Sequence, residues 1–266
     1  GHEVVGLARS DEAAERIAAA GAEVRRGDLD DLAGLRAGAA DADAVVHLAY
    51  IHDFSNIGAS AAADEAAIAA FGDELAGSGR PLVFASGVGV ARRIGDDVDA
   101  SAPGGHRFAA GRAALALAAR GVRPVLVGLP PTVHGDGDKA FVPALIDVAR
   151  RTGISAYPGD GTNRWSAVHR LDAARAFRLA AEHAPAGSAL QVAGDDGIEL
   201  REIASVIGEQ LGLPVASAEP SHFGWLAAFL AMDAAAESGP TRELLGWEPV
   251  EAGLLDDLRH GTYFAG

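Results

Sequence analysis

The sequence predicts an α/β fold in which helices cover both faces of a parallel sheet. Apolar segments of strand length alternate with helical segments through the first half of the chain. Continuous apolar segments of this kind are typical of parallel strands, which are buried on both faces. The second half has more helices and fewer apolar strands, which predicts a smaller, mostly helical region built onto the sheet.

The first helix carries both a start and a stop signal. Ser10 can act as its N-cap, with Asp11 and Glu12 in the first turn and Gly21 at the far end. Gly121 closes a later helix in the same way. We expect strands at 3–8, 24–29, 44–49, 81–85, 122–128 and 190–193, a turn at 159–163, and helices at 10–21, 31–37, 60–77, 108–120, 141–151, 171–182, 200–211 and 222–236.

Composition excludes several classes of function. The 266 residues carry 22 basic and 37 acidic side chains, a net charge of −15, which disfavours nucleic acid as a partner. The absence of cysteine excludes a disulfide scaffold, thiolate zinc sites and a cysteine nucleophile. No apolar run reaches the roughly 18 residues that span a bilayer, and no signal peptide is visible, so we expect no membrane partner and a cytoplasmic location.

Histidines do not indicate a metal site. His47, His52, His134 and His169 fit neither an HxxxH nor an HExxH spacing, and no carboxylate cluster accompanies them. We therefore expect no bound metal.

Several segments, in order along nearly the whole chain, resemble the extended short-chain dehydrogenase/reductases of the NAD-dependent epimerase/dehydratase type. The resemblance implies a Rossmann-like doubly wound sheet. It places a dinucleotide-binding core at 1–135 and a mainly substrate-binding region at 136–266, with some segments returning to the core, and the site between them. The segments are GHEVVGLARS, GDLDD, ADAVVHLA, RPLVFASGVGV, GVRPVLVGLPPTVHGDGD, AVHRLDAARAFRLAAE and TRELLGWEP.

The sequence departs from the family at its start. The family's first strand, its glycine-rich turn (TGxxGxxG) and its first helix should precede Gly1 and are not in the sequence. In the family this turn holds the pyrophosphate. Either the sequence is a fragment of a longer gene product, which we favour, or the protein is a degraded member.

The second departure concerns the catalytic pair. The family's Tyr-x-x-x-Lys is absent: the only lysine, Lys139, has Gly135 four residues before it. Aligned from the strand at 122–128, Arg107 takes the place of the lysine and Pro103 that of the tyrosine, with His106 adjacent.

The resemblance therefore implies that His106 donates a proton and that Arg107 acts as an electrostatic anchor. Ser86 stands beside Gly87, which occupies the family's usual serine position, and is a third catalytic candidate. The bland alternative is that His106 and Arg107 merely form the polar start of an amphipathic helix.

Cofactor-binding candidates follow the expected strands. Arg9 and Ser10 end the strand expected at 3–8. An arginine there suits the 2′-phosphate of NADP, so we expect NADP rather than NAD. The alternative is an exposed arginine before a capping serine. Three residues after the strand at 122–128 resemble the loop that packs on the nicotinamide: Pro130, Thr132 and Val133.

Two further groups should contact the adenosine. Asp28 and Leu29 resemble the pair that contacts adenine, although Asp28 could instead cap the next short helix. Leu48, Ala49 and Tyr50 should line the adenosine and ribose side of the crevice, unless they are simply the end of a strand.

Two functions remain open. The first is an NADP-dependent oxidoreductase of a small carbonyl or alcohol substrate with a non-standard active site. The second is a non-catalytic dinucleotide-binding redox sensor or regulatory protein, because one fold hosts many functions. The resemblance also makes a homodimer plausible, through the helices at 60–77 and 108–120. Arg164 and Trp165 could contact the substrate, or Trp165 could belong to the core.

Overall fold

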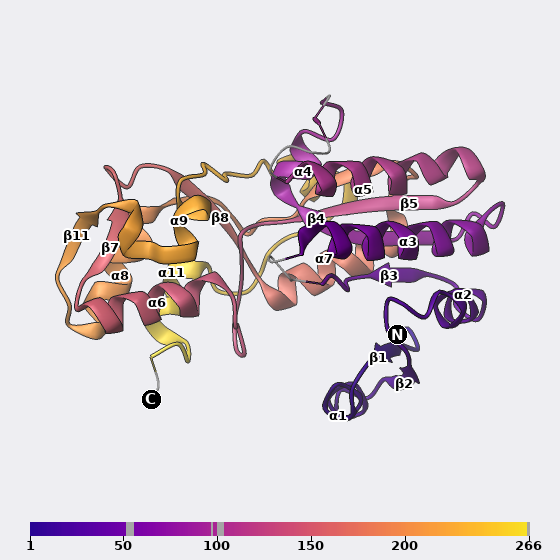
Figure 1. Ribbon diagram of the computed structural model, residues 1–266, viewed down its shortest axis with the longest axis horizontal. Helices are drawn as coiled ribbons and strands as arrows, with labels where there is room; N and C mark the ends of the chain where they lie inside the picture. The colour runs from indigo at the N-terminus through magenta and orange to yellow at the C-terminus, as the bar shows by residue number, and fades with distance from the viewer. Residues whose placement is uncertain (52–55, 97, 100–103, 265–266) are drawn as a thin grey trace. The chain divides into compact units, whose positions relative to one another are not determined.

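The computed structural model describes residues 1–51, 56–96, 98–99 and 104–264. The chain forms two compact units that interleave along the sequence (Figure 1). The first comprises Gly1–Phe84, Gly95–Leu126 and Pro185–Ser188, and the second comprises Ala85–Ile94, Val127–Ala184 and Ala189–Gly266. The functional division expected after residue 135 stays a prediction.

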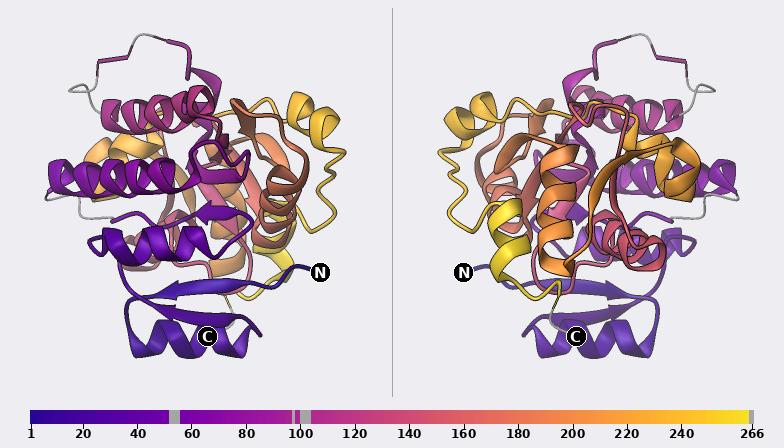
Figure 2. Two further views of the ribbon diagram at one scale, coloured as in Figure 1. Left: turned by 90° about the vertical axis from the view of Figure 1, so that its right-hand side faces the viewer. Right: turned by 90° about the vertical axis from the view of Figure 1, so that its left-hand side faces the viewer.

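The first unit begins with a β-α-β arrangement. Strand β1 (Val5–Ala8) pairs in parallel with β2 (Glu23–Arg26). Helix α1 (Asp11–Ala19) connects them and lies against this two-stranded sheet (Figure 2). The predicted cap is confirmed, because the Ala13 N–H donates to the Ser10 hydroxyl at 3.2 Å.

A second sheet has the strand order β3-β4-β5-β9. Strand β3 (Val45–His47) pairs in parallel with β4 (Pro81–Gly87), and β5 (Arg123–Leu129) and β9 (Ser188–Gln191) complete the order. Strands β4 and β5 each begin in the first unit and end in the second. Parallel strands connected by helices confirm the predicted fold class.

The helices of the first unit pack closely on one another. Helix α3 (Ile57–Leu75) contacts both α2 (Leu32–Ala40) and α5 (Gly105–Ala116). A Cβ at Gly72 of α3 would lie 2.5 Å from the end of the Leu117 side chain, so any larger residue there would force Leu117 to move. The helix expected at 108–120 ends as a 3-10 turn, Leu117–Arg120, closed by Gly121 at a φ of 71° as predicted.

Two strands of this unit are less buried than expected. Val5 and Leu7 of β1 and Val46 of β3 are exposed, and so is Leu48 just beyond β3. The reason is topological: in the described part of the chain β1 pairs only with β2, and β3 is the edge of its sheet. Burial on both faces needs neighbours that an edge strand does not have.

The second unit contains strands that the sequence did not reveal. Strand β8 (Arg164–His169) pairs with antiparallel β10 (Asp195–Glu199) and parallel β6 (Thr132–His134), and β7 (Ser155–Pro158) pairs with β11 (Val215–Ala218). The helices predicted at 141–151, 171–182 and 200–211 are confirmed as α6 (Phe141–Thr152), α7 (Arg170–His183) and α8 (Leu200–Leu211). Shorter helices are α4 (Val88–Arg92), α10 (Gly239–Leu245) and α11 (Leu254–His260).

The single helix predicted at 222–236 is wrong. A 3-10 segment η2 (Pro220–Leu226) is followed by the short helix α9 (Ala227–Leu230). Gly224 adopts φ 56° and ψ −128°, which breaks the helix. Beyond α9 the chain runs along β8, where Ala234 forms a bridge with Trp165.

No helix in the described residues has the length and apolar character needed to cross a membrane.

Candidate active site

A buried carboxylate in the first unit holds two basic side chains. Asp64 lies on α3 and is 5% exposed. Its Oδ1 is 2.8 Å from Nε2 of His47, at the end of β3, and its Oδ2 accepts a hydrogen bond of 3.0 Å from Nη1 of Arg107 on α5. One carboxylate thus fixes side chains from two other elements, which is the arrangement that a buried charge requires.

The first turn of α5, which carries Arg107, also contacts the phenol of Tyr50. Tyr50 follows β3 by three residues, and its hydroxyl oxygen is 3.2 Å from Nε2 of His106. The guanidinium carbon of Arg107 lies 4.3 Å from the centre of the Tyr50 ring, within the range of a cation–π contact. Consecutive residues of α5 therefore contact the phenol at its hydroxyl and on its face. We call these five residues the Tyr50 cluster: His47, Tyr50, Asp64, His106 and Arg107.

Burial shifts the pKa of two groups in the Tyr50 cluster, Tyr50 and His106. It raises the pKa of the Tyr50 phenol, an effect opposed by the Arg107 charge and reinforced by Asp64. Burial also lowers the pKa of the His106 imidazole, helped by Arg107 and opposed by Asp64 and Glu65. At neutral pH the phenol therefore keeps its proton and the imidazole is neutral.

The structure thus brings together two of the three predicted catalytic residues, His106 and Arg107. The third, Ser86, lies in β4 within the second unit. Ser86 is buried, and its hydroxyl has no hydrogen-bond partner among the described residues. Pro103, aligned with the family's tyrosine, and His52 fall outside the described residues.

The predicted NADP-binding residues Arg9 and Ser10 follow β1. The Gly27 N–H donates to the Ala8 carbonyl at 3.3 Å, so the carboxyl ends of β1 and β2 are adjacent. Arg9 is exposed there, while the Ser10 hydroxyl is occupied in capping α1. Asp28 comes two residues after the end of β2, at the same edge as Arg9.

Asp28 does not cap α2, so that alternative is wrong. Its Oδ1 accepts the N–H groups of Asp30 and Asp31 at 3.0 and 3.1 Å and so closes a tight turn. The cap of α2 is Asp31, whose Oδ1 accepts the Gly34 N–H at 2.9 Å. Asp28 is exposed, so its carboxylate can accept from an adenine amino group.

The apolar residues that were predicted to contact adenosine are exposed or half-buried. Leu48 is 61% exposed, Ala49 is exposed and Leu29 is half-buried. An exposed guanidinium, a carboxylate and an apolar surface fit the adenosine half of a dinucleotide. The glycine-rich turn that would hold the pyrophosphate is not in the sequence.

The nicotinamide-loop candidates belong to the second unit. Pro130 is buried between β5 and β6, and Val133 is half-buried in β6. Thr132 opens β6, is 2% exposed, and its hydroxyl finds no partner among the described residues. A buried hydroxyl without a partner is uncommon in proteins.

Other polar residues of the second unit have structural roles. Nδ1 of the buried His134 is 2.7 Å from Asp257, and the His169 side chain caps α7 by accepting from the Leu171 N–H. Trp165 is completely buried in the core, and Arg164 pairs with Asp233 at 3.1 Å. This burial supports the alternative that Trp165 belongs to the core.

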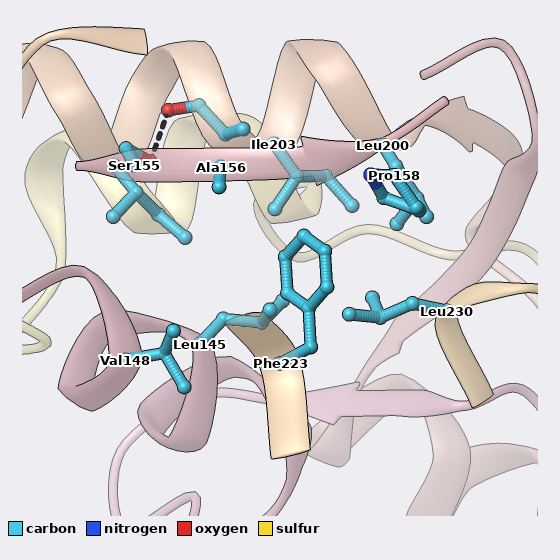
Figure 3. A pocket seen from close by; sticks show the side chains of 11 residues that line it. Leu145, Val148, Ser155, Ala156, Pro158, Leu200, Ile203, Phe223 and Leu230 are labelled. Carbon is cyan, nitrogen blue, oxygen red and sulfur yellow. Dashed lines mark hydrogen bonds between the residues drawn. The ribbon is translucent and has the colours of Figure 1, made fainter. Parts of the chain in front are cut away.

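Two cavities lie within the second unit. One, of about 230 Å³, is lined by α6 and the C-terminal segment; there the Tyr263 hydroxyl donates to Asp138 at 2.7 Å. The other, of about 10 Å³, lies among apolar side chains, with Phe223 projecting between Leu145 of α6 and Ile203 of α8 (Figure 3). It has room for about one water and is a packing gap in the core.

No protein-family model matches the chain. The uncharacterized protein YLL056C of Saccharomyces cerevisiae is 43% identical, over 97% of this chain and 90% of its own length. The uncharacterized protein C2A9.02 of Schizosaccharomyces pombe is also 43% identical, over 99% of this chain and 92% of its own length. The chain belongs to their family.

Solved structures show the fold. MoeE5 in complex with UDP-glucose and NAD has a TM-score of 0.71 and 21% identity, covering 99% of this chain and 98% of that one. The UDP-glucose 4-epimerase of Thermotoga maritima has a TM-score of 0.73 and 16% identity, covering 100% and 91%. DesIV, a dTDP-glucose 4,6-dehydratase of Streptomyces venezuelae with NAD bound, has a TM-score of 0.70 and 18% identity, covering 98% and 87%. The predicted Rossmann-like fold is confirmed.

Sequence reasoning missed Asp64 and treated His47 only as a doubtful metal ligand. A signal for Asp64 existed in the alanine-rich segment. Ala67, Ile68 and Phe71 follow it at spacings of three, four and seven, so Asp64 shares the apolar face of its helix. An acid on such a face needs a buried partner.

Proposed function

We propose that the chain is an oxidoreductase that uses a nicotinamide dinucleotide and acts on a small carbonyl or alcohol compound. The observation that carries this proposal is the Tyr50 cluster, a protonated phenol held between an imidazole and a guanidinium just beyond the end of β3. In open α/β sheets, ligands bind outside the carboxyl ends of the strands. The NAD named with MoeE5 and DesIV supports the same class of cofactor.

Arg107 has the clearest role in this proposal. Its charge persists at every physiological pH, and Asp64 fixes its position. It can stabilise the negative charge that develops on oxygen during carbonyl reduction. When bound, the nicotinamide supplies or accepts the hydride. His106 exchanges a proton with the Tyr50 hydroxyl. Ser86 stays a predicted catalytic residue, and Pro130, Thr132 and Val133 stay predicted cofactor contacts.

Arg9 supports NADP over NAD within the proposal. It is exposed directly after β1, where a guanidinium can pair with a 2′-phosphate. The neighbours' names carry NAD, so the two nucleotides must be compared directly. Calorimetric titration of the chain with NADPH and NADH should give tighter NADPH binding. Arg9→Ala should weaken NADPH binding and leave NADH binding unchanged.

Turnover provides the second test. Purified chain is mixed with NADPH and a panel of probe carbonyls, and loss of the reduced-nicotinamide absorbance is followed. Arg107→Ala should lower turnover about tenfold or more. Arg120→Ala is the matched control, because Arg120 pairs with Asp73 on the surface of the same unit. Unchanged turnover in Arg107→Ala removes this residue from the mechanism.

The alternative is a non-catalytic dinucleotide-binding sensor. The absence of a Tyr-x-x-x-Lys pair from the sequence favours it. Nucleotide binding without oxidation by any probe carbonyl would support this alternative. A homodimer through α3 and α5 and a cytoplasmic location stay predictions, and sedimentation velocity tests the former.

A further inference from the structure

We propose that Tyr50 is the catalytic proton donor of the reaction. Tyr50 and Arg107, which come from two different elements, would then replace the tyrosine–lysine pair that the resembled family carries on a single helix. The inference rests on the proposed function and deepens it. The phenol follows β3, and the cation that serves it, Arg107, comes from α5. Tyr50 was expected only as a lining residue of the adenosine and ribose side.

The environment of Tyr50 suits a proton donor. Its hydroxyl meets a neutral imidazole at 3.2 Å, so the proton has a route to and from the oxygen. The hydroxyl of Tyr263, by contrast, donates to the Asp138 carboxylate, and burial together with this contact raises the pKa of Tyr263, although the Gly135 N–H that the hydroxyl accepts acts in the opposite direction. Of these two phenols, only Tyr50 is placed to release a proton.

Arg107 makes proton release feasible. A phenolate is costly in a partly buried site unless a positive charge lies beside it. The guanidinium carbon is 4.3 Å from the ring centre and is held there by Asp64, which His47 braces from the other side. Asp64 and His47 therefore act as positioning residues, since they work on the phenol through Arg107.

The proton balance closes with the residues present. As the hydride adds to the carbonyl carbon, the Oη–H bond of Tyr50 breaks and its proton goes to the carbonyl oxygen. The phenolate that remains is stabilised by Arg107. In the tautomer with hydrogen on Nε2, His106 then returns a proton to Oη while its Nδ1 takes one from solvent. One solvent proton is consumed per alcohol formed, and Tyr50 is again protonated. His106 is left with hydrogen on Nδ1, and it regains the Nε2 tautomer by giving that proton to solvent and taking one from solvent on Nε2.

The first test compares Tyr50→Phe with the wild-type chain and with Tyr157→Phe, a control in β7 of the second unit. Phenylalanine keeps the ring under Arg107 and removes only the hydroxyl. With NADPH and the probes para-nitrobenzaldehyde and phenanthrenequinone, kcat of Tyr50→Phe should fall about 100-fold or more. KM and the calorimetric Kd for NADPH should change far less than kcat, and Tyr157→Phe should behave as wild type.

A second readout needs no turnover. Alkaline titration of tyrosinate absorbance in wild type and Tyr50→Phe gives, by difference, the ionisation of Tyr50. Because Arg107 lowers the pKa of Tyr50, Arg107→Gln should move this ionisation to higher pH. An ionisation that does not move upward means that Arg107 does not serve the phenol, which overturns the inference.

The outcomes separate the inference from the proposed function. If wild type turns over and Tyr50→Phe turns over equally, the proposed function stands and the inference is overturned. If wild type binds NADPH but oxidises it with neither probe, the sensor alternative is supported and Tyr50 has no catalytic role. If wild type binds neither nucleotide, both proposals fail. A selective loss of kcat with the predicted titration shift supports both.

Discussion

Asp64→Ala is expected to lower the free energy of unfolding by about 3 kcal/mol. Removing one partner of a buried ion pair costs roughly 3–5 kcal/mol when the remaining charge stays buried. Arg107 is 24% exposed and can regain water, which reduces its share. His47 is 7% exposed and cannot, so it contributes the roughly 1–3 kcal/mol of a buried polar group without its partner.

Asp64→Asn separates charge from shape. The amide oxygen can still accept from Arg107, and the amide nitrogen can donate to Nε2 of His47 in the appropriate tautomer. The loss should therefore be about 1 kcal/mol, the difference between a charged and a neutral hydrogen bond. The free energy of unfolding should therefore be lowest for Asp64→Ala, intermediate for Asp64→Asn and highest for wild type.

Urea unfolding followed by circular dichroism measures both variants, with the slope checked for constancy. Asp73→Ala is the control. Asp73 lies on α3, as Asp64 does, and pairs with Arg36 of α2 and with Arg120, but it is exposed, so no change should be detectable. If Asp64→Ala is as stable as Asp73→Ala, Asp64 does not hold the cluster together and Arg107 is positioned by other contacts.

Three further predictions concern the remaining structure. Asp172→Ala should lower stability by about 3–5 kcal/mol in urea unfolding, because this buried carboxylate accepts the N–H groups of Val250 and Glu251. Phe223→Ala should cost about 3–5 kcal/mol by the same measurement, because it greatly enlarges the small apolar cavity. Burial lowers the pKa of His106 in the folded chain, so just below about pH 6.5 the unfolded chain binds more protons than the folded chain does. The contribution of His106 to the free energy of unfolding is therefore fully present above that pH and is lost as the pH falls through the lowered pKa of the folded chain. An NMR titration of His106 should give a midpoint below the ordinary value for histidine, about 6.5.

Local signals account for what the sequence predicted correctly. The first helix was found because Ser10 and Gly21 mark its ends chemically, one by a side-chain cap and one by a positive φ of 83°. Continuous apolar segments identified β3, β4 and β5, since parallel strands need apolar residues on both faces.

Prediction failed where partners distant in sequence decide the conformation. Segment 222–236 has a helical apolar pattern, yet Asp233 accepts the Arg164 backbone N–H at 2.9 Å and Ala234 pairs with β8. These contacts join positions about 70 residues apart. Gly224 permits the helix to break within the segment. Strands β7 and β11 are short and partly polar, so they lack the apolar run that reveals a buried strand.

The site shows the same division between local and distant information. His106 and Arg107 were found because they are consecutive and occupy the place of a known cation. Their partner Asp64 is 43 residues before Arg107 and 17 after His47, so no spacing rule connects the three. Only the packing of α3 against α5 brings the carboxylate to the guanidinium.

The absent Tyr-x-x-x-Lys pair therefore does not decide between catalysis and simple binding. That motif places a phenol and a cation one helical turn apart, so its four-residue spacing brings the two side chains close together in space. Tyr50 and Arg107 reach a similar relation from a strand end and a helix, 57 positions apart in the chain. Arginine suits such a contact better than lysine, because its planar group stacks on the ring and still donates to Asp64. A protein that only bound a dinucleotide would not require a cation fixed by a buried acid against a partly buried phenol, and this is why the geometry favours the enzyme.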